Sequence, residues 1–448
     1  IDNMTTRITS ENITDATIGI ADLASSVPLN TQWQAVKTST FTAVAGEGYF
    51  VNSGSALTMN LPAGVAGATV VVADYARNFA TYNLTVSPNG SEKIGGVAND
   101  ATLDVNGQAA TFVYIDATKG WINIQNAEDT ETGVIPYLSA TGGTITESGN
   151  FKIHTFTGDG DFVVNRLATE SPAPIYNTVS YLVVAGGGGG GGTGTTTHTG
   201  AGGGAGGYRG GRNQPVDSYT ESPLCASTGL PVGAATYPIT VGGGGAPPSN
   251  GPQRGGTGSN SVFSTITSAG GGGGGSLGHP SNPACRGGGD GGSGGGGSSQ
   301  VAGPGGCGNV PPVSPPQGTN GAQGIDSPPD LRAGSGGGAT AAGSQGSPTA
   351  IPAVGGAGAT VHITGSPVAY AGGGGAGSTS GAGPNAGGAG GAGGGGQGGC
   401  AGSVFTGNNG TANTGGGGGG AAGNPSGSAN KLGGTGGSGV VILRYRFQ

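Results

Sequence analysis

The stretch YLVVAGGGGGGG, residues 181–192, decides the fold of this chain, because an apolar, strand-like segment runs directly into seven glycines. The same order recurs in YPITVGGGG (237–245), FSTITSAGGGGGG (263–275) and VHITGSPVAYAGGGG (361–375). Of the 109 glycines, 92 follow Ala185. Composition alone favours a disordered, low-complexity tail. The repeated order indicates a folded unit instead, and apolar segments at 178–185 and 439–448 bracket it.

Glycine limits what such a unit can be. Fixing the backbone costs about 1–2 kcal/mol per residue, and glycine loses the most freedom. Side chains are too few to offset this cost, so backbone hydrogen bonds and close packing must do so. Collagen needs glycine at every third position, and TGTTTHTG (193–200) breaks that register. The sequence therefore predicts a bundle of polyglycine II helices over 186–438, framed by strands within 151–185 and 439–448, with disorder as the alternative.

The rest of the chain predicts β-structure with little or no α-helix. Residues 1–34 are polar with isolated aliphatics, which is typical either of a neck or attachment segment shared by several chains or of a frayed terminus. Short alternating segments between 35 and 126 predict a small all-β domain, a sandwich or barrel-like. We expect a linker over 127–150 and the glycine-rich domain over 151–448. Within it, 145–164 predicts a hairpin that turns at Gly158-Asp159-Gly160, with Phe151, Ile153, Phe156 and Phe162 on its apolar side.

Charge is unevenly distributed between these parts. Residues 1–185 hold 7 of the 15 basic and 17 of the 22 acidic residues, which leaves 8 basic and 5 acidic residues for the glycine-rich part. A phosphate-binding basic patch is therefore not expected, and we expect no nucleic-acid partner. No run of about 18 apolar residues occurs, so we expect no membrane insertion.

Catalytic and metal motifs are weak. The four histidines, His154, His198, His279 and His362, lack ligand spacing, and His154 on its predicted strand favours a structural role. Asp326 and Asp330 could pair for glycoside hydrolysis, but their proline-rich surroundings predict no rigid groove. We expect no enzyme activity, no metal and no cofactor. Four cysteines without a CxxC spacing could form disulfides in an oxidising compartment or remain thiols: Cys225, Cys285, Cys307 and Cys400.

Non-glycine insertions at 208–237, 276–286 and 310–332 are the predicted binding loops, because binding residues concentrate in loops on rigid scaffolds. Tyrosine and arginine are favoured anchors at binding surfaces. The alternative is that these side chains only pack or solubilise the bundle edge. The candidate receptor-binding residues are Tyr208, Arg209, Arg212, Tyr219, His279, Arg286 and Arg332.

Five segments resemble bacteriophage tail-fibre proteins with a glycine-rich C-terminal domain. They are FKIHTFTGDGDFVV, SYLVVAGGGGGGG, YPITVGGGG, SVFSTITSAGGGGGG and the terminal GGSGVVILRYRF, which together cover 151–447. The stretch GEGYFVNSGSALTMNLPAGVAGATVVVADY is similar to a small β-domain in fibres of tailed phages. The proline-rich insertions and the cysteines are not part of these patterns.

This resemblance implies a structural and binding protein. It would be a tail fibre or fibre-tip adhesin, located on the virion and extracellular, and its loops would contact a bacterial surface glycan or outer-membrane protein. The implied partners are other virion fibre proteins and further copies of the chain, with a homotrimer favoured. A self-assembling extracellular filament subunit is the alternative, and a polysaccharide depolymerase is the third.

Overall fold

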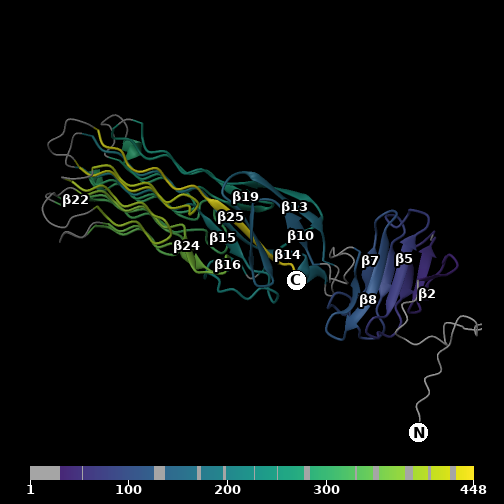
Figure 1. Cartoon of the computed structure of the whole chain (residues 1–448). Helices are drawn as coiled ribbons and strands as arrows, with labels where there is room; N and C mark the ends of the chain where they lie inside the picture. Colours follow the sequence, from purple (N-terminus) through teal and green to yellow (C-terminus); the bar gives the residue numbers. More distant parts are fainter. Residues whose placement is uncertain are drawn as a thin grey trace, which may run out of the picture. The chain divides into compact units, whose positions relative to one another are not determined.

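The chain forms two units, Ile1–Ile135 and Pro136–Gln448, in a computed structural model (Figure 1). The structure describes residues 31–52, 54–125, 137–168, 173–194, 198–226, 228–249, 251–276, 283–327, 330–346, 353–378, 387–401, 405–423 and 430–448. Residues 1–30 of the expected neck therefore lie outside the described residues. Each unit is described by itself.

The first unit consists of two β-sheets around one hydrophobic core. One sheet has the order β1-β3-β5-β8-β9 and the other the order β2-β4-β6-β7. Alternate residues of β5 and β4, among them Val70, Val72 and Met59, are fully buried between them. The strands are β1 (Gln32–Trp33), β2 (Phe41–Thr42), β3 (Glu47–Val51), β4 (Leu57–Asn60), β5 (Thr69–Asp74), β6 (Leu84–Ser87), β7 (Ala101–Leu103), β8 (Ala109–Asp116) and β9 (Gly120–Asn123).

The first six strands of this unit alternate between the two sheets. As a result β1, β3 and β5 pair in parallel, and so do β2, β4 and β6. The remaining pairs, β5–β8, β8–β9 and β6–β7, are antiparallel. The all-β prediction is confirmed, with mixed sheets.

Two further sheets frame the glycine runs in the second unit. One follows the order β11-β12-β25-β14-β15-β16, with β17 paired to β14, and the other follows β10-β13-β18-β19-β20. The helical element α1 (Ala173–Tyr176) is only four residues long. The strands of these sheets are β10 (Ser139–Thr141), β11 (Thr144–Ser148), β12 (Phe151–Phe156), β13 (Gly160–Arg166), β14 (Thr178–Val184), β15 (Tyr208–Gly211), β16 (Cys225–Ala226), β17 (Leu230–Pro231), β18 (Thr236–Thr240), β19 (Ser261–Phe263), β20 (Ile266–Ser268) and β25 (Val440–Arg446).

The predicted framing strands within 151–185 and 439–448 are present, and β12, β14 and the C-terminal β25 pair in one sheet. The predicted hairpin over 145–164 is wrong, because β12 and β13 belong to different sheets. The turn at 158–160 carries the chain from one sheet to the other. Phe156 before the turn and Phe162 after it pack in the same hydrophobic core. Ile153 lies three residues from Phe156, on the opposite face of β12 and in another core. The hairpin is β11–β12, and Gly149 takes its positive φ of 58°.

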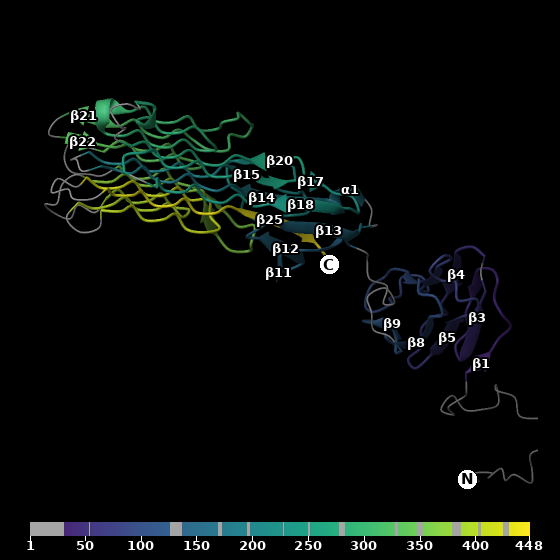
Figure 2. The same ribbon diagram turned by 90° about the horizontal axis from the view of Figure 1, so that it is seen from above.

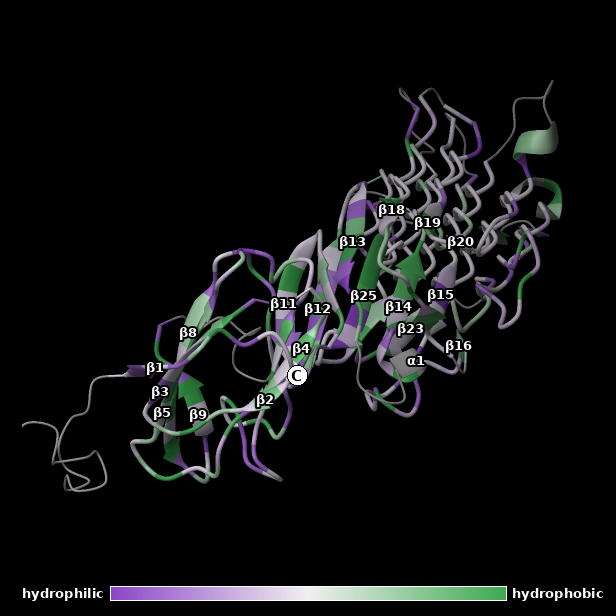
Figure 3. Ribbon diagram, turned by 90° about the vertical axis from the view of Figure 1, so that its right-hand side faces the viewer, coloured by the Kyte–Doolittle hydropathy of each residue, from purple (hydrophilic) through white to green (hydrophobic). Residues whose placement is uncertain are grey.

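Extended glycine runs lead away from β14 and β25 and lie side by side (Figures 1 and 2). Figure 3 shows the contrast between the hydrophobic framing strands and the nearly neutral runs. Short strand pairs interrupt the runs: β21 (Ile325–Ser327) with β22 (Asp330–Arg332), and β23 (Ala359–Val361) with β24 (Val368–Tyr370).

Hydrogen bonds between the runs repeat every three residues. In 186–191 successive N–H groups donate to three different neighbouring runs, and the fourth residue returns to the first run. The donor–acceptor distances are 2.8–3.0 Å. The bonds are Gly186 to Ser259, Gly187 to Gly437, Gly188 to Gly204, Gly189 to Gly256, Gly190 to Gly434 and Gly191 to Ala201. The runs are thus held by backbone groups, and the absence of Cβ atoms permits this close approach.

Candidate functional site

The predicted receptor-binding residues fall into two separate regions. Tyr208, Arg209, Arg212 and Tyr219 lie on β15 or in the insertion that follows it, next to the framing sheets. Arg332 ends β22, which lies at the opposite end of the runs (Figures 1 and 2). Arg286 directly follows the short helix η4 (Pro283–Cys285). His279 lies outside the described residues.

Tyr208 and Tyr219 are part of a hydrophobic core rather than of an exposed loop surface. Their exposed fractions are 1% and 9%, and they pack in one cluster with Ile442 and Tyr370. Burial raises the pKa of both phenols. In this conformation neither ring is available to a receptor.

Arg212 and Arg209 are half-buried and already make contacts within the chain. Arg212 Nη1 donates to the carbonyl oxygen of Tyr219 at 2.7 Å, and its Nε lies 3.2 Å from the Glu221 carboxylate. Arg209 Nη1 donates to the Thr267 carbonyl at 3.5 Å. These contacts hold the insertion in place, which is a structural role.

A buried ion pair that was not predicted from the sequence lies beneath this insertion. Arg444 Nε on β25 donates to both carboxylate oxygens of Asp217, at 3.1 and 3.0 Å, and the two side chains are about 7% and 2% exposed. Ser180 Oγ donates to the same carboxylate at 2.9 Å, and the guanidinium lies 4.3 Å from the ring centre of Phe151. Burial raises the pKa of Asp217, while Arg444 and Ser180 oppose that shift.

The sequence could have predicted that Arg444 has an acidic partner. This arginine lies inside the apolar segment GVVILRYRF, and a buried charge requires a partner. The partner itself could not be chosen from sequence, since Asp217 is 227 residues away.

His154 is structural, as its strand position suggested. It is fully buried, and its Nδ1 lies 2.7 Å from the Gly142 carbonyl oxygen. A carbonyl only accepts, so Nδ1 carries the proton and Nε2 accepts from the Tyr445 hydroxyl at 3.2 Å. Burial lowers the pKa of this imidazole.

None of the considered disulfides is formed, because all four cysteines are reduced in the structure. They are distributed over β16, η4, a loop and an isolated β-bridge position, and only Cys307 is exposed. Burial, together with Glu221, raises the pKa of Cys225 to about 12, so this thiol stays protonated at neutral pH.

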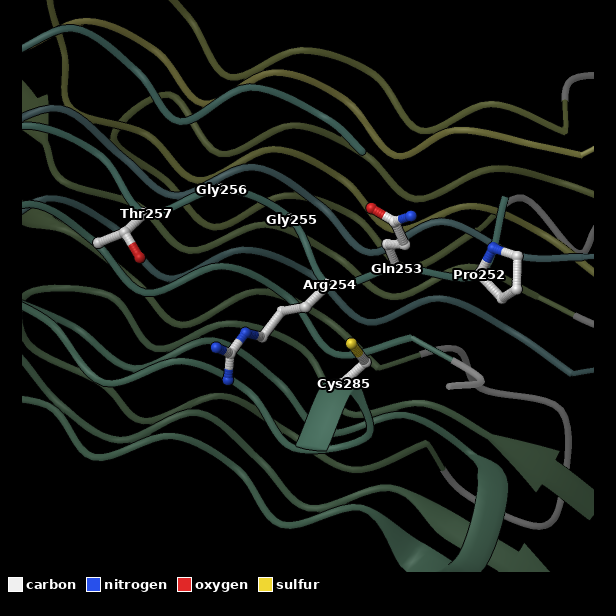
Figure 4. Close-up of a pocket in the computed structure, with 7 residues that line it drawn as sticks. All are labelled: Pro252, Gln253, Arg254, Gly255, Gly256, Thr257 and Cys285. Carbon is white, nitrogen blue, oxygen red and sulfur yellow. The ribbon is translucent and has the colours of Figure 1, made fainter. Parts of the chain in front are cut away.

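A groove of about 520 Å³ opens on the side of the glycine runs (Figure 4). We call it the Arg254 groove. Residues 252–257 form one wall and Cys285 of η4 the other, and both walls are hydrogen-bonded to the run 270–276. Arg254 extends from its run beside Cys285, whose sulfur points toward the same wall (Figure 4). The lining residues are Pro252, Gln253, Arg254, Gly255, Gly256, Thr257 and Cys285.

Arg254 was not among the predicted binding residues, because PQRGGTGSN (252–260) has the composition of a glycine run. A three-residue rhythm was the signal that could have found it. Arg254, Thr257 and Asn260 are exposed, while Gly255 and Gly256 between them face neighbouring runs. Of these three side chains, Arg254 and Thr257 line the groove, whereas Asn260 accepts a hydrogen bond from Gly270 N–H in the neighbouring run.

Two further properties bear on the chemistry of the described residues. Within those ranges, no three His, Cys, Asp or Glu side chains gather closely enough to hold a metal ion. The helices found there are also too short or too polar to cross a lipid bilayer.

Comparison with known proteins gives one family. No curated protein sequence matches the chain. A family described as "Glycine-rich domain" matches residues 165–446, which is more than half of the 448 residues and includes β14, the glycine runs and β25. This chain therefore belongs to the glycine-rich domain family.

Proposed function

We propose that the glycine runs form a polyglycine II helix bundle that serves as a rigid platform. An extended helix with about three residues per turn directs successive N–H groups to three sides. The three-residue repeat of hydrogen bonds in 186–191 supports this geometry. Added Cβ atoms at most run positions would collide with the backbone of a neighbouring run, as at Gly187 and Gly273. Glycine is therefore required by packing rather than by flexibility.

We further propose that the chain is a phage tail fibre or fibre-tip adhesin that attaches to a bacterial surface glycan or outer-membrane protein. The observation that carries this proposal is that glycines and larger residues occupy different sides of the runs. Glycines occupy positions that face other runs, while Arg254 and Thr257 present side chains outward in a groove. A rigid scaffold with side chains confined to its surface is suited to recognition. Membership of the glycine-rich domain family is compatible with this role.

Binding to intact bacteria tests the adhesin. The fluorescently labelled full chain is incubated with a panel of strains and with an array of bacterial surface glycans. We expect saturable binding to a subset of strains, competed by unlabelled chain. Absence of saturable binding to every strain and every glycan would contradict the proposal.

A self-assembling filament subunit is the second candidate, and β11 favours it. This strand lies at the edge of its sheet, and four of its five residues are exposed, with Ile145 among them. Exposed sheet edges can pair with another chain. Light scattering that finds a discrete trimer supports the fibre, and open-ended polymers in electron micrographs support the filament. For a depolymerase, incubation with surface polysaccharide would release new reducing ends; we expect none.

A further inference from the structure

The Arg254 groove lies where the packing of glycine runs lacks one neighbour. The N–H groups of the run 270–276 again point in three directions. Those of Gly271 and Gly274 donate to the run that begins at 186, and those of Gly272 and Gly275 donate to the run 293–296. The third direction has no such run.

In this third direction, only the N–H groups at the two ends of the run 270–276 have hydrogen-bond acceptors among the described residues, and neither acceptor is a backbone group of a glycine run. Gly270 N–H donates to the Asn260 side-chain oxygen at 2.9 Å, and Ser276 N–H donates to the Cys285 carbonyl at 2.9 Å. Gly273 lies midway, and its N–H makes no hydrogen bond to any residue in the described ranges. Gly273 N–H is thus a backbone donor, between the run 252–257 and η4, that no described residue accepts.

The wall of the groove adds further donors. The N–H groups of Arg254 and Thr257 likewise have no acceptor in the part of the chain that the structure describes, and both side chains are exposed. The guanidinium of Arg254 contributes a forked set of N–H donors, and the Thr257 hydroxyl contributes one more. Oxyanions in proteins are commonly bound by backbone N–H groups together with an arginine side chain.

Charge in the groove has one sign. Arg254 is its only formally charged lining residue. The acidic residue on the opposite wall's run, Asp290, is engaged elsewhere, because its carboxylate accepts a hydrogen bond from Cys307 N–H at 2.7 Å. An anion entering the groove therefore meets a positive charge without a competing carboxylate among the lining residues.

We propose that the Arg254 groove binds a sugar-borne oxyanion, a carboxylate or a phosphate, of a bacterial surface saccharide. This inference rests on the proposed adhesin function. A volume of about 520 Å³ exceeds what an inorganic ion fills and lies in the range of small-molecule sites. The Gln253 amide and the Pro252 ring offer a polar and an apolar contact for the rest of the sugar.

Cys285 provides the assay, because its thiol lines the groove. Purified full-length chain is labelled with a maleimide, and the labelling rate at each cysteine is measured by peptide mass spectrometry. The exposed Cys307 serves as an internal reference. The probes are trigalacturonate, mannose 6-phosphate, neutral maltotriose and inorganic phosphate.

We expect trigalacturonate or mannose 6-phosphate to slow labelling of Cys285 without slowing Cys307, and maltotriose to have no effect. Arg254→Gln should raise the concentration for half-protection by about fivefold to thirtyfold, the range between an exposed ion pair and a charge-assisted hydrogen bond. Arg254→Lys should retain part of the effect, since it keeps the charge but loses the fork. Arg166→Gln, at an exposed arginine that ends β13, should change nothing.

The inference is overturned by no protection by either charged sugar, by equal protection by maltotriose, or by unchanged protection in Arg254→Gln. Equal protection by inorganic phosphate identifies an adventitious ion only and overturns the saccharide assignment. The cell-binding assay separates the two proposals. Binding to bacteria without protection of Cys285 refutes the groove alone, whereas protection by charged sugars without binding to any strain refutes the adhesin.

Discussion

Replacing Gly273 with alanine tests whether the glycine runs are packed as the structure describes. The new Cβ would overlap the carbonyl group of Gly255, which is backbone and cannot rotate away. Relieving such an overlap by local shifts costs about 1–3 kcal/mol. Separating the two runs would also strain two hydrogen bonds, Gly255 N–H to the Gly274 carbonyl at 3.0 Å and Gly258 N–H to the Gly271 carbonyl at 2.9 Å.

These bonds are worth about 0.5–1.5 kcal/mol each, so Gly273→Ala should lower the free energy of unfolding by about 2–6 kcal/mol. Differential scanning calorimetry of the full chain measures the effect as a fall in Tm. One kcal/mol corresponds to roughly 2–4 °C in a domain of 150–250 residues, so we expect a fall of about 4 °C or more.

Gly243 is the matched control in another run. A Cβ built there meets no heavy atom within 4 Å, and its φ is not in the left-handed region. Gly243→Ala should therefore leave stability unchanged or raise it by up to about 1 kcal/mol, because alanine restricts the unfolded chain. Equal Tm values for the two variants would refute the packing argument, since the substitutions are chemically identical and differ only in the space around them.

Three further predictions concern buried polar groups. Burial holds the pKa of His154 below its usual 6.5, so the unfolded chain binds more protons than the folded chain in acid. The free energy of unfolding should therefore fall as the pH drops from 6.5 toward the folded pKa. The slope is at most about 1.4 kcal/mol per pH unit. His154→Gln should flatten that slope in calorimetry between pH 7.5 and 5. Asp217→Ala leaves Arg444 buried without its carboxylate and should cost about 3–5 kcal/mol in denaturant unfolding; a loss below about 1 kcal/mol would contradict the ion pair. At pH 8, iodoacetamide should modify Cys307 in the folded chain and spare Cys225, and comparable rates would show that Cys225 is not shielded.

Local sequence determined which segments are strands and which are runs. Alternating apolar residues mark β5 and β8, and the apolar segments before and after the glycine-rich part become β14 and β25, neighbours in one sheet. These features depend on near neighbours in the chain, because side chains alternate along a strand and a missing Cβ acts at its own position. His154 was also correctly interpreted as structural, since its strand position already favoured burial.

Tertiary structure alone decided the long-range partners. The turn at 158–160 has the composition of a hairpin turn, yet it joins two sheets because Phe156 and Phe162 share the core between them. The pairing of Arg444 with Asp217 and the Arg254 groove also depend on distant segments. A run of glycines carries no side-chain information about which run it will contact. The groove beside Arg254 forms only when all the runs are packed together. For that reason it could not be predicted from the sequence.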